Sequence, residues 1–426
     1  MEREVHIQIM EYFIKHDLIT LDQFAFLERH STVTCLHRIL DDWYEAINNK
    51  QFIVSCFFDI QKCFDSINHK ILLQKLSLHG INGNELNWFT SYLTNRKQIV
   101  KCHNQLCEPL NVPTGVPQGS ALGPFLFLVF VNDFPQHIRQ SLSNLFADDA
   151  AIYTTGNTVR ETESKMQQSV SDAAKWYTNN NIPLNISKTL CMLSGSETML
   201  NMIDGHEKVL NIYLNNDRLN QVSCSPYLGM HIDHNLKLNQ HIQHLCKVLS
   251  AKVAVLGRLR KVLNCGVLNK IYMTCIQPVF DYAISLWGHC SEYNKSLVTR
   301  IQHRAARIVT GNFDYFIVRG DTLVTQLRWQ SIEKRRDYFT ACLMFKCLRN
   351  LAPLHLMNEI NLVSETHDVN TRSAQQGNIN VPKPNSGLFK KSLRYHGAII
   401  WNALPTELKQ LEDIDEFKRK YKQHYF

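Results

Sequence analysis

Two adjacent carboxylates, Asp148 and Asp149, are the side chains of this 426-residue chain best suited to chemistry. Residues 144–146 have the composition of a short strand and residues 150–154 that of a return strand, so both acids are expected at a hairpin tip. A pair of carboxylates offers only oxygen ligands, which suit Mg²⁺. Because Asp favours turns for conformational reasons alone, a solvated turn is the alternative interpretation.

A third carboxylate, Asp59, lies near the end of the apolar run FIVSCFFDI, residues 52–60. A nearly unbroken apolar run of this length predicts a strand that is buried on both faces. A carboxylate at the end of such a strand is costly to bury unless a cation compensates its charge. If this strand pairs with the hairpin, Asp59, Asp148 and Asp149 converge on one spot of the size of a metal ion.

Further elements must position these acids. Apolar residues at helical spacing predict helices over residues 2–16, 33–48 and 84–94, with a polar turn at 21–32 and a polar hairpin at 98–112. Asp65 is expected to cap a helix from Ser66 to Leu78, which Gly80 ends. Residues 114–120 carry two glycines and a proline, so the backbone there can approach a ligand closely. An apolar helix follows, and a simple loop with a core helix is the alternative interpretation.

Composition places the chain among globular proteins of two or three domains, with 44% hydrophobic and 20% charged residues. The first ten residues contain no secretory signal, and the longest apolar run, 121–131, is too short to span a bilayer. These features predict a soluble intracellular protein, nuclear or cytoplasmic, without a membrane partner. The 13 cysteines form no Cys-x-x-Cys pair, which favours reduced structural thiols. His241, His244 and Cys246 lack a second ligand pair for zinc.

Positive charge is concentrated in one region. Residues 237–350 contain 18 Lys and Arg against 6 Asp and Glu, a balance of +12, whereas the whole chain carries +8. Within it, residues 240–263 have the pattern of a long amphipathic helix, with Lys247, Arg258 and Lys261 opposite the apolar face. A solvated helix would mix both signs of charge, so this pattern predicts a surface that binds nucleic-acid phosphates with strong salt dependence and little sequence preference.

Five motifs in one order give the chain its resemblance to a known family. They are FFDIQKCFD, GVPQGSALGP, FADD, NIPLNISKTLC and the tripeptide Tyr227-Leu228-Gly229. The chain resembles the reverse transcriptases of non-LTR (LINE-type) retrotransposons and is most similar to the jockey-like group. Downstream segments, RIQHRAARIVTG, RWQSIEKRRDYF with FKCLRNLAP, and YHGAIIWNALP, resemble the thumb and C-terminal region of the same proteins.

The resemblance implies an α+β right-hand polymerase fold, with a palm of antiparallel strands backed by helices. It divides the chain into partial fingers (1–50), a palm with the catalytic motifs (51–235), a basic helical thumb (236–350), and a linker with a C-terminal helical extension (351–426). The linker itself is expected at residues 364–384, which are polar and contain Gly, Pro and Asn.

The resemblance also implies RNA-directed DNA synthesis, in which dNTPs are added to the 3′-hydroxyl of a DNA primer on an RNA template. Asp59, Asp148 and Asp149 would hold two Mg²⁺ ions, for which Mn²⁺ can substitute. Among the other matched residues, Ile60 and Phe64 would contact the nucleotide, with Phe64 as a steric gate against a ribose 2′-hydroxyl, and Gln118 and Gly119 would lie under the nucleotide. Lys188 would act as general acid for pyrophosphate. The primer grip would be formed by Tyr227, Leu228 and Gly229. A core phenylalanine and a solvated lysine are the alternative interpretations of Phe64 and Lys188.

The chain also departs from the family pattern. It begins after most of the expected finger elements and lacks the endonuclease domain of complete elements, so an N-terminally truncated polymerase is expected. Ala25 stands where the family usually has Gly, and Leu27 and Glu28 stand near a usual basic residue. Intact catalytic acids favour a polymerase, whereas missing fingers favour a noncatalytic nucleic-acid-binding remnant, decayed or co-opted. A metal-dependent nucleotidyl enzyme with another substrate is a third hypothesis.

Overall fold

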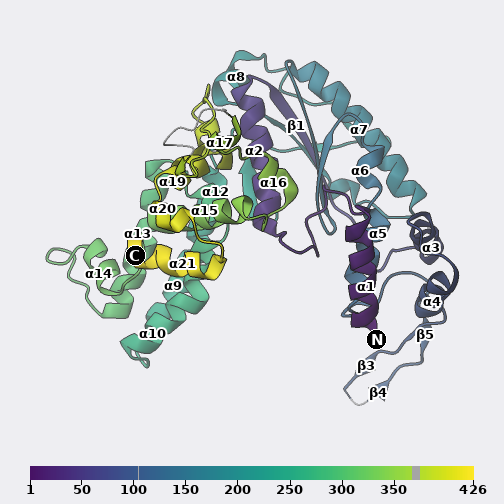
Figure 1. The fold of residues 1–426 in the computed structure, drawn as a ribbon, viewed down its shortest axis with the longest axis horizontal. Helices are drawn as coiled ribbons and strands as arrows, with labels where there is room; N and C mark the ends of the chain where they lie inside the picture. The colour runs from purple at the N-terminus through teal and green to yellow at the C-terminus, as the bar shows by residue number, and fades with distance from the viewer. Residues whose placement is uncertain (104, 367–374) are drawn as a thin grey trace. The chain divides into compact units, whose positions relative to one another are not determined.

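The computed structural model describes residues 1–103, 105–366 and 375–426 (Figure 1). The chain forms two compact units, each assembled from separate stretches of sequence. Unit 1 contains Met1–Cys35, Phe52–Leu193 and Ile203–Val222, and unit 2 contains Leu36–Gln51, Ser194–Met202 and Ser223–Phe426. Part of the linker expected at 364–384 lies outside the described residues. No helix in the described ranges is both long and apolar enough to cross a bilayer.

Unit 1 is built on a five-stranded sheet with the strand order β11-β8-β1-β7-β6. The strands are β1 (Phe52–Phe58), β6 (Leu142–Phe146), β7 (Asp149–Gly156), β8 (Leu190–Ser194) and β11 (Asn220–Gln221). Every residue of β1 is buried, as its apolar run predicted, and β1 pairs antiparallel with β7 from Phe52↔Gly156 to Phe58↔Ala150. The strand next to the predicted hairpin is therefore the strand that leads into Asp59.

Helices cover this sheet, so the fold class is α+β, as predicted. The longest, α7 (Val159–Asn179), packs against β1 and β7 (Figure 1). It begins where Thr158 accepts a hydrogen bond from the backbone N–H of Glu161, and its buried side chains recur at helical spacing. The other helices and short strands of unit 1 are α1 (Glu2–Lys15), α3 (His69–Leu78), α4 (Gly83–Leu93), α5 (Gly123–Val131), α6 (Phe134–His137), η1 (Ile186–Lys188), β2 (Lys97–Gln98), β3 (Lys101–Cys102), β4 (Gln105–Leu106), β5 (Leu110–Asn111), β9 (Tyr213–Leu214) and β10 (Asp217–Arg218).

The helix expected from Ser66 begins three residues later than predicted. Helix α3 starts at His69, and Asn68 is its N-cap, since the Asn68 side chain accepts from the backbone N–H groups of Lys70 and Ile71. Asp65 therefore does not cap this helix, and that prediction was wrong. Both Asp and Asn are good caps, and local chemistry does not distinguish between two such residues three positions apart.

Unit 2 is mostly helical. Helix α2 (Thr32–Asn48) runs from unit 1 into it, and its further elements are α8 (Glu197–Met202), β12 (Cys224–Tyr227), β13 (Met230–Asp233), α9 (Asn239–Leu259), α10 (Cys265–Ile271), η2 (Tyr272–Ile276), α11 (Gln277–Asp281), α12 (Ile284–Trp287), α13 (Glu292–Thr310), α14 (Gly320–Gln326), α15 (Ile332–Leu348), α16 (Leu354–Asn358), α17 (Val363–Thr366), η3 (Phe389–Lys391), η4 (Leu393–Gly397), α19 (Ala398–Asn402), α20 (Thr406–Lys409) and α21 (Ile414–Tyr425).

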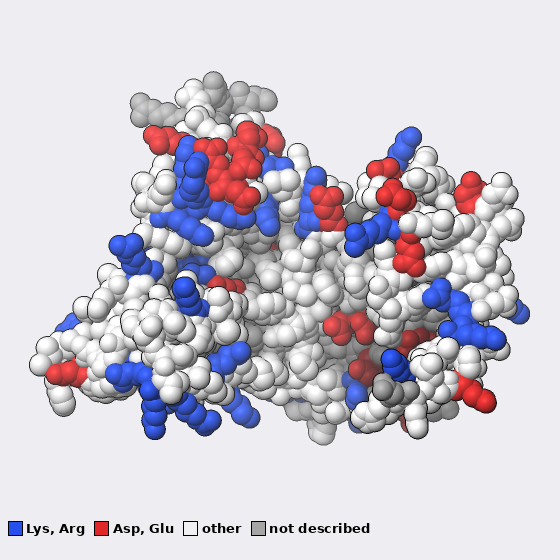
Figure 2. All heavy atoms as spheres, turned by 90° about the horizontal axis from the view of Figure 1, so that it is seen from below, with Lys and Arg blue, Asp and Glu red and all other residues white. Residues whose placement is uncertain are grey.

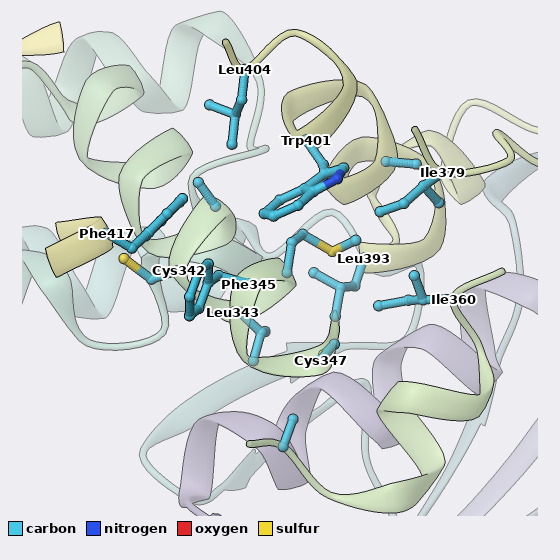
Figure 3. Close-up of a cluster of buried hydrophobic side chains, with 14 of the residues drawn as sticks. Cys342, Leu343, Phe345, Cys347, Ile360, Ile379, Leu393, Trp401, Leu404 and Phe417 are labelled. Atoms are coloured by element: carbon cyan, nitrogen blue, oxygen red, sulfur yellow. The ribbon is translucent and has the colours of Figure 1, made fainter. Parts of the chain in front are cut away.

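The C-terminal residues share a hydrophobic core with α15. Phe345 of α15 lies 4.5 Å from Phe417 of α21 between ring centroids, and Trp401 of α19 lies 6.3 Å from Phe417. Figure 3 shows these rings gathered in one cluster with Leu393 and Leu404. The indole N–H of Trp401 donates to the carbonyl oxygen of Gly377 at 3.0 Å, so its polar atom is satisfied while the ring is buried. The C-terminal extension thus stabilises the helical unit from within.

Candidate active site

The Asp-Asp hairpin forms as predicted. Strands β6 and β7 pair up to Phe146↔Asp149, so a two-residue turn of Ala147 and Asp148 joins them. Ala147 has φ +52°, a left-handed conformation of the kind that tight hairpin turns require. Asp148 is exposed at the tip, and Asp149 is exposed at the first position of β7.

A buried glutamine ties this turn to the N-terminal segment. The Gln23 Oε1 atom accepts hydrogen bonds from the backbone N–H groups of Phe24, Ala25 and Ala147, at 3.0, 2.9 and 3.1 Å. The backbone on either side of Gln23 also pairs with the edge strand β6, since Leu145 exchanges hydrogen bonds with Asp22 and Phe24. Gln23 is only 1% exposed. One side chain therefore fixes the backbone from which Asp148 projects.

Asp59 lies beside the hairpin acids. The last β1–β7 pair is Phe58↔Ala150, so Asp59 directly follows the paired end of β1, and Asp149 directly precedes Ala150 on β7. Both acids therefore lie at the same end of the sheet. Asp59 is half-buried, and its backbone is held by a hydrogen bond from the Asn185 N–H to its carbonyl oxygen at 2.9 Å.

The charges of these acids act on one another. The pKa of Asp149 is raised from 3.8, first because its carboxyl is partly shielded from water, although the residue as a whole is exposed, and then by the negative charges of Asp148 and Asp59. Burial and the charge of Asp148 also raise the pKa of the buried Cys63 thiol. The end of the sheet is thus a point of concentrated negative potential, which a cation would relieve.

These residues fit a hard divalent cation by donor type, because all three are carboxylates. The expectation of a preformed cluster is not met, however. Within the described residues, no three potential ligands among His, Cys, Asp and Glu are gathered closely enough to hold an ion. Asp148 and Asp149 are exposed and can change rotamer, and Mg²⁺ commonly keeps several water ligands beside one or two carboxylates.

The fourth motif lies next to Asp59. Ile60 forms an isolated antiparallel bridge with Leu184, and the Gln61 N–H donates to the carbonyl oxygen of Pro183 at 3.1 Å. The chain then turns through η1, which ends at Lys188. Lys188 is exposed, so its ammonium group is accessible to a ligand. The structure thus places this segment next to Asp59, and the role of Lys188 stays a prediction.

The glycine-rich loop packs against the residues that follow Asp59. Gly115 has φ +88°, and a Cβ atom there would lie 2.8 Å from the Cα atom of Asp65. Its N–H donates to Ile67 and its carbonyl oxygen lies 2.7 Å from the His69 Nε2 atom, while the Val116 N–H donates to Phe64. Glycine is required at 115 because the two backbones touch.

Phe64, Gln118 and Asp65 line this junction. The ring of Phe64 stacks on Phe127, with centroids 4.6 Å apart, and meets the edge of Phe26 at 6.2 Å. Asp65 accepts a hydrogen bond from the Gln118 side-chain nitrogen at 2.9 Å, so its carboxylate contacts the glycine-rich loop instead of capping a helix. Gln118 and Gly119 are both exposed, and no heavy atom lies within 4 Å of a Cβ built on Gly119.

A groove of about 990 Å³ adjoins these residues. Its walls are the segment at Lys62 and Asp65, the residues of the polar hairpin from Arg96 onward, and the glycine-rich loop up to Gln118. Its walls carry Lys62, Arg96 and Lys97 against Asp65 and Glu108. The remaining positive charge complements the phosphates of a nucleotide or a nucleic acid.

The remaining predicted residues belong to unit 2. Strands β12 and β13 pair up to Tyr227↔Met230, so Leu228 and Gly229 form a two-residue turn with φ +46° and +74°. The Tyr282 hydroxyl donates to the Leu228 carbonyl oxygen. Separately, Lys247, Arg258 and Lys261 are all exposed, and the first two lie on α9 with Ile242, Leu245, Leu249 and Leu256 buried behind them.

Sequence reasoning missed two positioning residues in unit 1. Gln23 lies in a segment that was predicted only as a polar turn, and Asp65 was interpreted as a cap. Neither has a local signal, because each acts on a residue more than 50 positions away in sequence. The same segment accommodates Ala25, which has no left-handed φ and is 1% exposed, so the usual Gly is not required for the backbone here.

Comparisons with known proteins agree with the motifs. A family model described as reverse transcriptase (RNA-dependent DNA polymerase) matches residues 3–232. The chain is 27% identical to a probable RNA-directed DNA polymerase from transposon BS of Drosophila melanogaster, covering 80% of this chain and 38% of the relative. It is also 27% identical to the RNA-directed DNA polymerase from mobile element jockey of the same species, covering 71% of this chain and 34% of the relative. The chain therefore spans less than two fifths of the length of these relatives.

Solved structures give a weaker likeness. A telomerase from Candida albicans, in complex with a fragment of telomeric RNA, matches with a TM-score of 0.40 and 12% sequence identity, covering 70% of this chain and 54% of that one.

Proposed function

The chain belongs to the reverse transcriptase (RNA-dependent DNA polymerase) family, and from this premise we propose that it catalyses the addition of dNTPs to a primer 3′-hydroxyl on an RNA template. Its relatives from jockey and similar elements are non-LTR retrotransposon polymerases, so the primer is proposed to be DNA. The observation that carries the proposal is the register of the sheet, which brings Asp59 to the same end of the sheet as Asp149 and the Asp148 turn.

The catalytic roles follow from these positions. Asp59, Asp148 and Asp149 would bind two Mg²⁺ ions through their carboxylate oxygens. When bound, the ions lower the pKa of the primer hydroxyl and neutralise charge on the triphosphate and on the leaving pyrophosphate. Gln23 would keep the Asp148 turn in one conformation, and the exposed Lys188 would donate a proton to pyrophosphate.

The substrate contacts are proposed from the glycine-rich loop and its neighbours. Phe64, stacked on Phe127, would face the sugar and exclude a ribose 2′-hydroxyl, with Ile60 contributing to the same pocket. Gln118, oriented by Asp65, and Gly119 would contact the incoming nucleotide. The cationic groove at Lys62 and Arg96 suits its phosphates or those of the template.

Unit 2 would hold the nucleic acid. The Tyr227-Leu228-Gly229 turn is proposed to position the primer end, and Lys247, Arg258 and Lys261 to contact backbone phosphates. The division into partial fingers, palm, thumb and C-terminal extension remains part of this proposal. Because RNA templates and dNTPs are intracellular molecules, we place the activity inside the cell, in the nucleus or cytoplasm.

The test is primer extension with dNTPs on an RNA template, with and without Mg²⁺, by the wild type and by Asp148→Asn. Extension that requires Mg²⁺ and disappears in Asp148→Asn is the expected result. Retention of activity in Asp148→Asn would contradict the proposed site. Absence of extension by the wild type, with salt-sensitive RNA binding that Asp148→Asn leaves unchanged, would favour the noncatalytic remnant instead.

A further inference from the structure

An aromatic loop in unit 2 is exposed to an unusual degree. It joins α13 to α14 and contains Phe313, Tyr315, Phe316 and Ile317. Phe316 is fully exposed and Ile317 is 81% exposed, so two large apolar side chains lie side by side in solvent. Large apolar side chains gathered at one exposed place commonly mark an interaction site.

Hydrogen bonds to a buried side chain hold this loop in one conformation. The guanidinium of Arg307, which is 5% exposed, donates to the carbonyl oxygens of Asn312, Asp314 and Val318 at 3.5, 3.2 and 2.8 Å. It also lies 4.1 Å from the ring centroid of Tyr315. A single buried arginine therefore holds both ends of the loop and the inner face of one of its rings.

An aspartate fixes the tip. The Asp314 carboxylate accepts hydrogen bonds from the backbone N–H groups of Phe316 and Ile317, both at 3.0 Å. On the other side, Arg260 at the C-terminal end of α9 lies 4.7 Å from the ring centroid of Phe313. With Phe313 and Tyr315 held by arginines, Phe316 and Ile317 are the side chains left facing outward.

The surroundings indicate the chemistry of the partner. Arg300, Arg304 and Arg307 follow one another at helical spacing on α13, so a row of arginines leads along the helix to the loop. The first two are exposed, as are Arg258 and Lys261 near the end of α9. Figure 2 shows one face of the molecule, on which Lys and Arg gather along the lower left edge with few Asp or Glu.

We propose that the loop formed by residues 312–318 is a stacking platform for unpaired bases of a single-stranded nucleic acid whose phosphates contact the exposed Arg300 and Arg304 of α13. Exposed aromatic faces beside a cationic track are how proteins bind single strands, because every base has a face that can stack. Paired bases are already stacked within a duplex and do not offer that face. The inference takes from the proposed function only that the partner is a nucleic acid, and it does not depend on catalysis.

The test uses full-length protein without Mg²⁺ or dNTPs. Binding of a labelled single-stranded RNA oligonucleotide, its DNA equivalent and a hairpin duplex of equal length is compared for the wild type, Phe316→Ala and a matched control, Tyr293→Ala. Tyr293 is 69% exposed in the first turn of α13, so it is another exposed ring at the other end of the same helix. Phe316 makes no buried contact, so its replacement should not disturb the fold.

We expect Phe316→Ala to weaken single-strand binding about tenfold, in line with the loss of one stacked base. Duplex binding by this variant, and all binding by Tyr293→Ala, should stay within about twofold of the wild type, as surface changes away from a site usually do. Phe316→Trp should retain affinity, and the single-stranded oligonucleotide should quench its additional tryptophan fluorescence.

Three outcomes would overturn the inference. One is unchanged single-strand affinity in Phe316→Ala, and another is an equal loss for single strand and duplex. The third is self-association of the wild type that Phe316→Ala abolishes, which would assign the loop to a second copy of the chain. Failure of primer extension leaves this measurement unaffected, so the two proposals can fail separately.

Discussion

The acidic end of the sheet in unit 1 and the basic helices of unit 2 use charge in opposite ways. In unit 1, Asp59, Asp148 and Asp149 lie close enough for their charges to interact, and each is attached to backbone held by hydrogen bonds. In unit 2, Lys247 and Arg258 are exposed on the surface of one helix. The first region needs exact placement of a few groups, whereas the second needs only enough positive charge on one face.

Replacing one acid of unit 1 should distinguish the two regions most clearly, because it should affect catalysis and leave RNA binding unchanged. Asp148→Asn should lower the rate of primer extension by about 10²- to 10³-fold, because a single group that stabilises charge in a transition state is worth about this much. Affinity for RNA should stay within about twofold of the wild type, since the acid makes no attractive contact with phosphates. Steady-state extension assays and filter binding measure the two quantities, and a parallel loss in both would break the comparison.

The core of unit 2 should respond strongly to a change that leaves its charge intact. Trp401→Ala should lower the free energy of unfolding by about 3–5 kcal/mol, because a large buried ring is lost from a packed cluster. Phe316→Ala is the matched control and should change it by less than about 0.5 kcal/mol, since that ring is exposed. Urea denaturation followed by circular dichroism measures both, and similar values for the two variants would contradict the described core.

Placement in unit 1 can be tested without touching an acid. Gln23→Leu removes the acceptor of three backbone N–H groups and should reduce the extension rate about 10- to 100-fold, with a higher Mg²⁺ concentration at half-maximal activity. The control is Gln221→Leu in β11 of the same sheet, where Gln221 accepts from the Leu210 N–H at 2.8 Å. A similar shift of the Mg²⁺ dependence in both variants would reduce Gln23 to a purely structural role.

The basic surface should lose function gradually. The triple variant Lys247→Ala, Arg258→Ala and Lys261→Ala should reduce the slope of log Kd against log salt by about 2 to 3, because each phosphate contact releases about 0.7–0.9 of a counterion. The single variants should each show about a third of this effect. A full loss of RNA binding from one substitution would show that this region too depends on exact placement.

The smallest expected effect is a change in the stability of the substrate-free protein that arises from its clustered acids. The folded-state pKa of Asp149 lies above 3.8, so the folded protein holds a proton on this carboxyl more tightly than the unfolded chain does. Stability should therefore fall as the pH rises from about 3.8 through the folded-state pKa. At neutral pH the repulsion is fully present, so Asp149→Asn should raise Tm slightly. Mg²⁺ at about 100 times its Kd should stabilise the wild type by about 2.7 kcal/mol and the variant by less. Thermal unfolding with and without MgCl₂ measures this, and equal Mg²⁺ stabilisation would exclude Asp149 as a ligand.

The sequence predicted the parts of the site whose signals are local. The apolar run of β1 and the strand-turn-strand pattern around Asp148 identified the acids, and helical spacing identified the buried face of α9. Boundaries were less accurate, since β1 ends at Phe58 and α9 at Leu259. The cap of α3 was wrong because Asp65 and Asn68 are equivalent by local chemistry.

The sequence by itself determined which residues carry the chemistry, because the order and spacing of motifs such as FFDIQKCFD and FADD are properties of the chain. Only the tertiary structure decided what holds them. The contacts of Gln23 with Ala147, and of Asp65 with Gln118, join residues 124 and 53 positions apart, and no local pattern encodes such pairs. Likewise, the exposure of Phe316 follows from the way Arg307 folds its loop, whereas composition alone assigns a phenylalanine to the core.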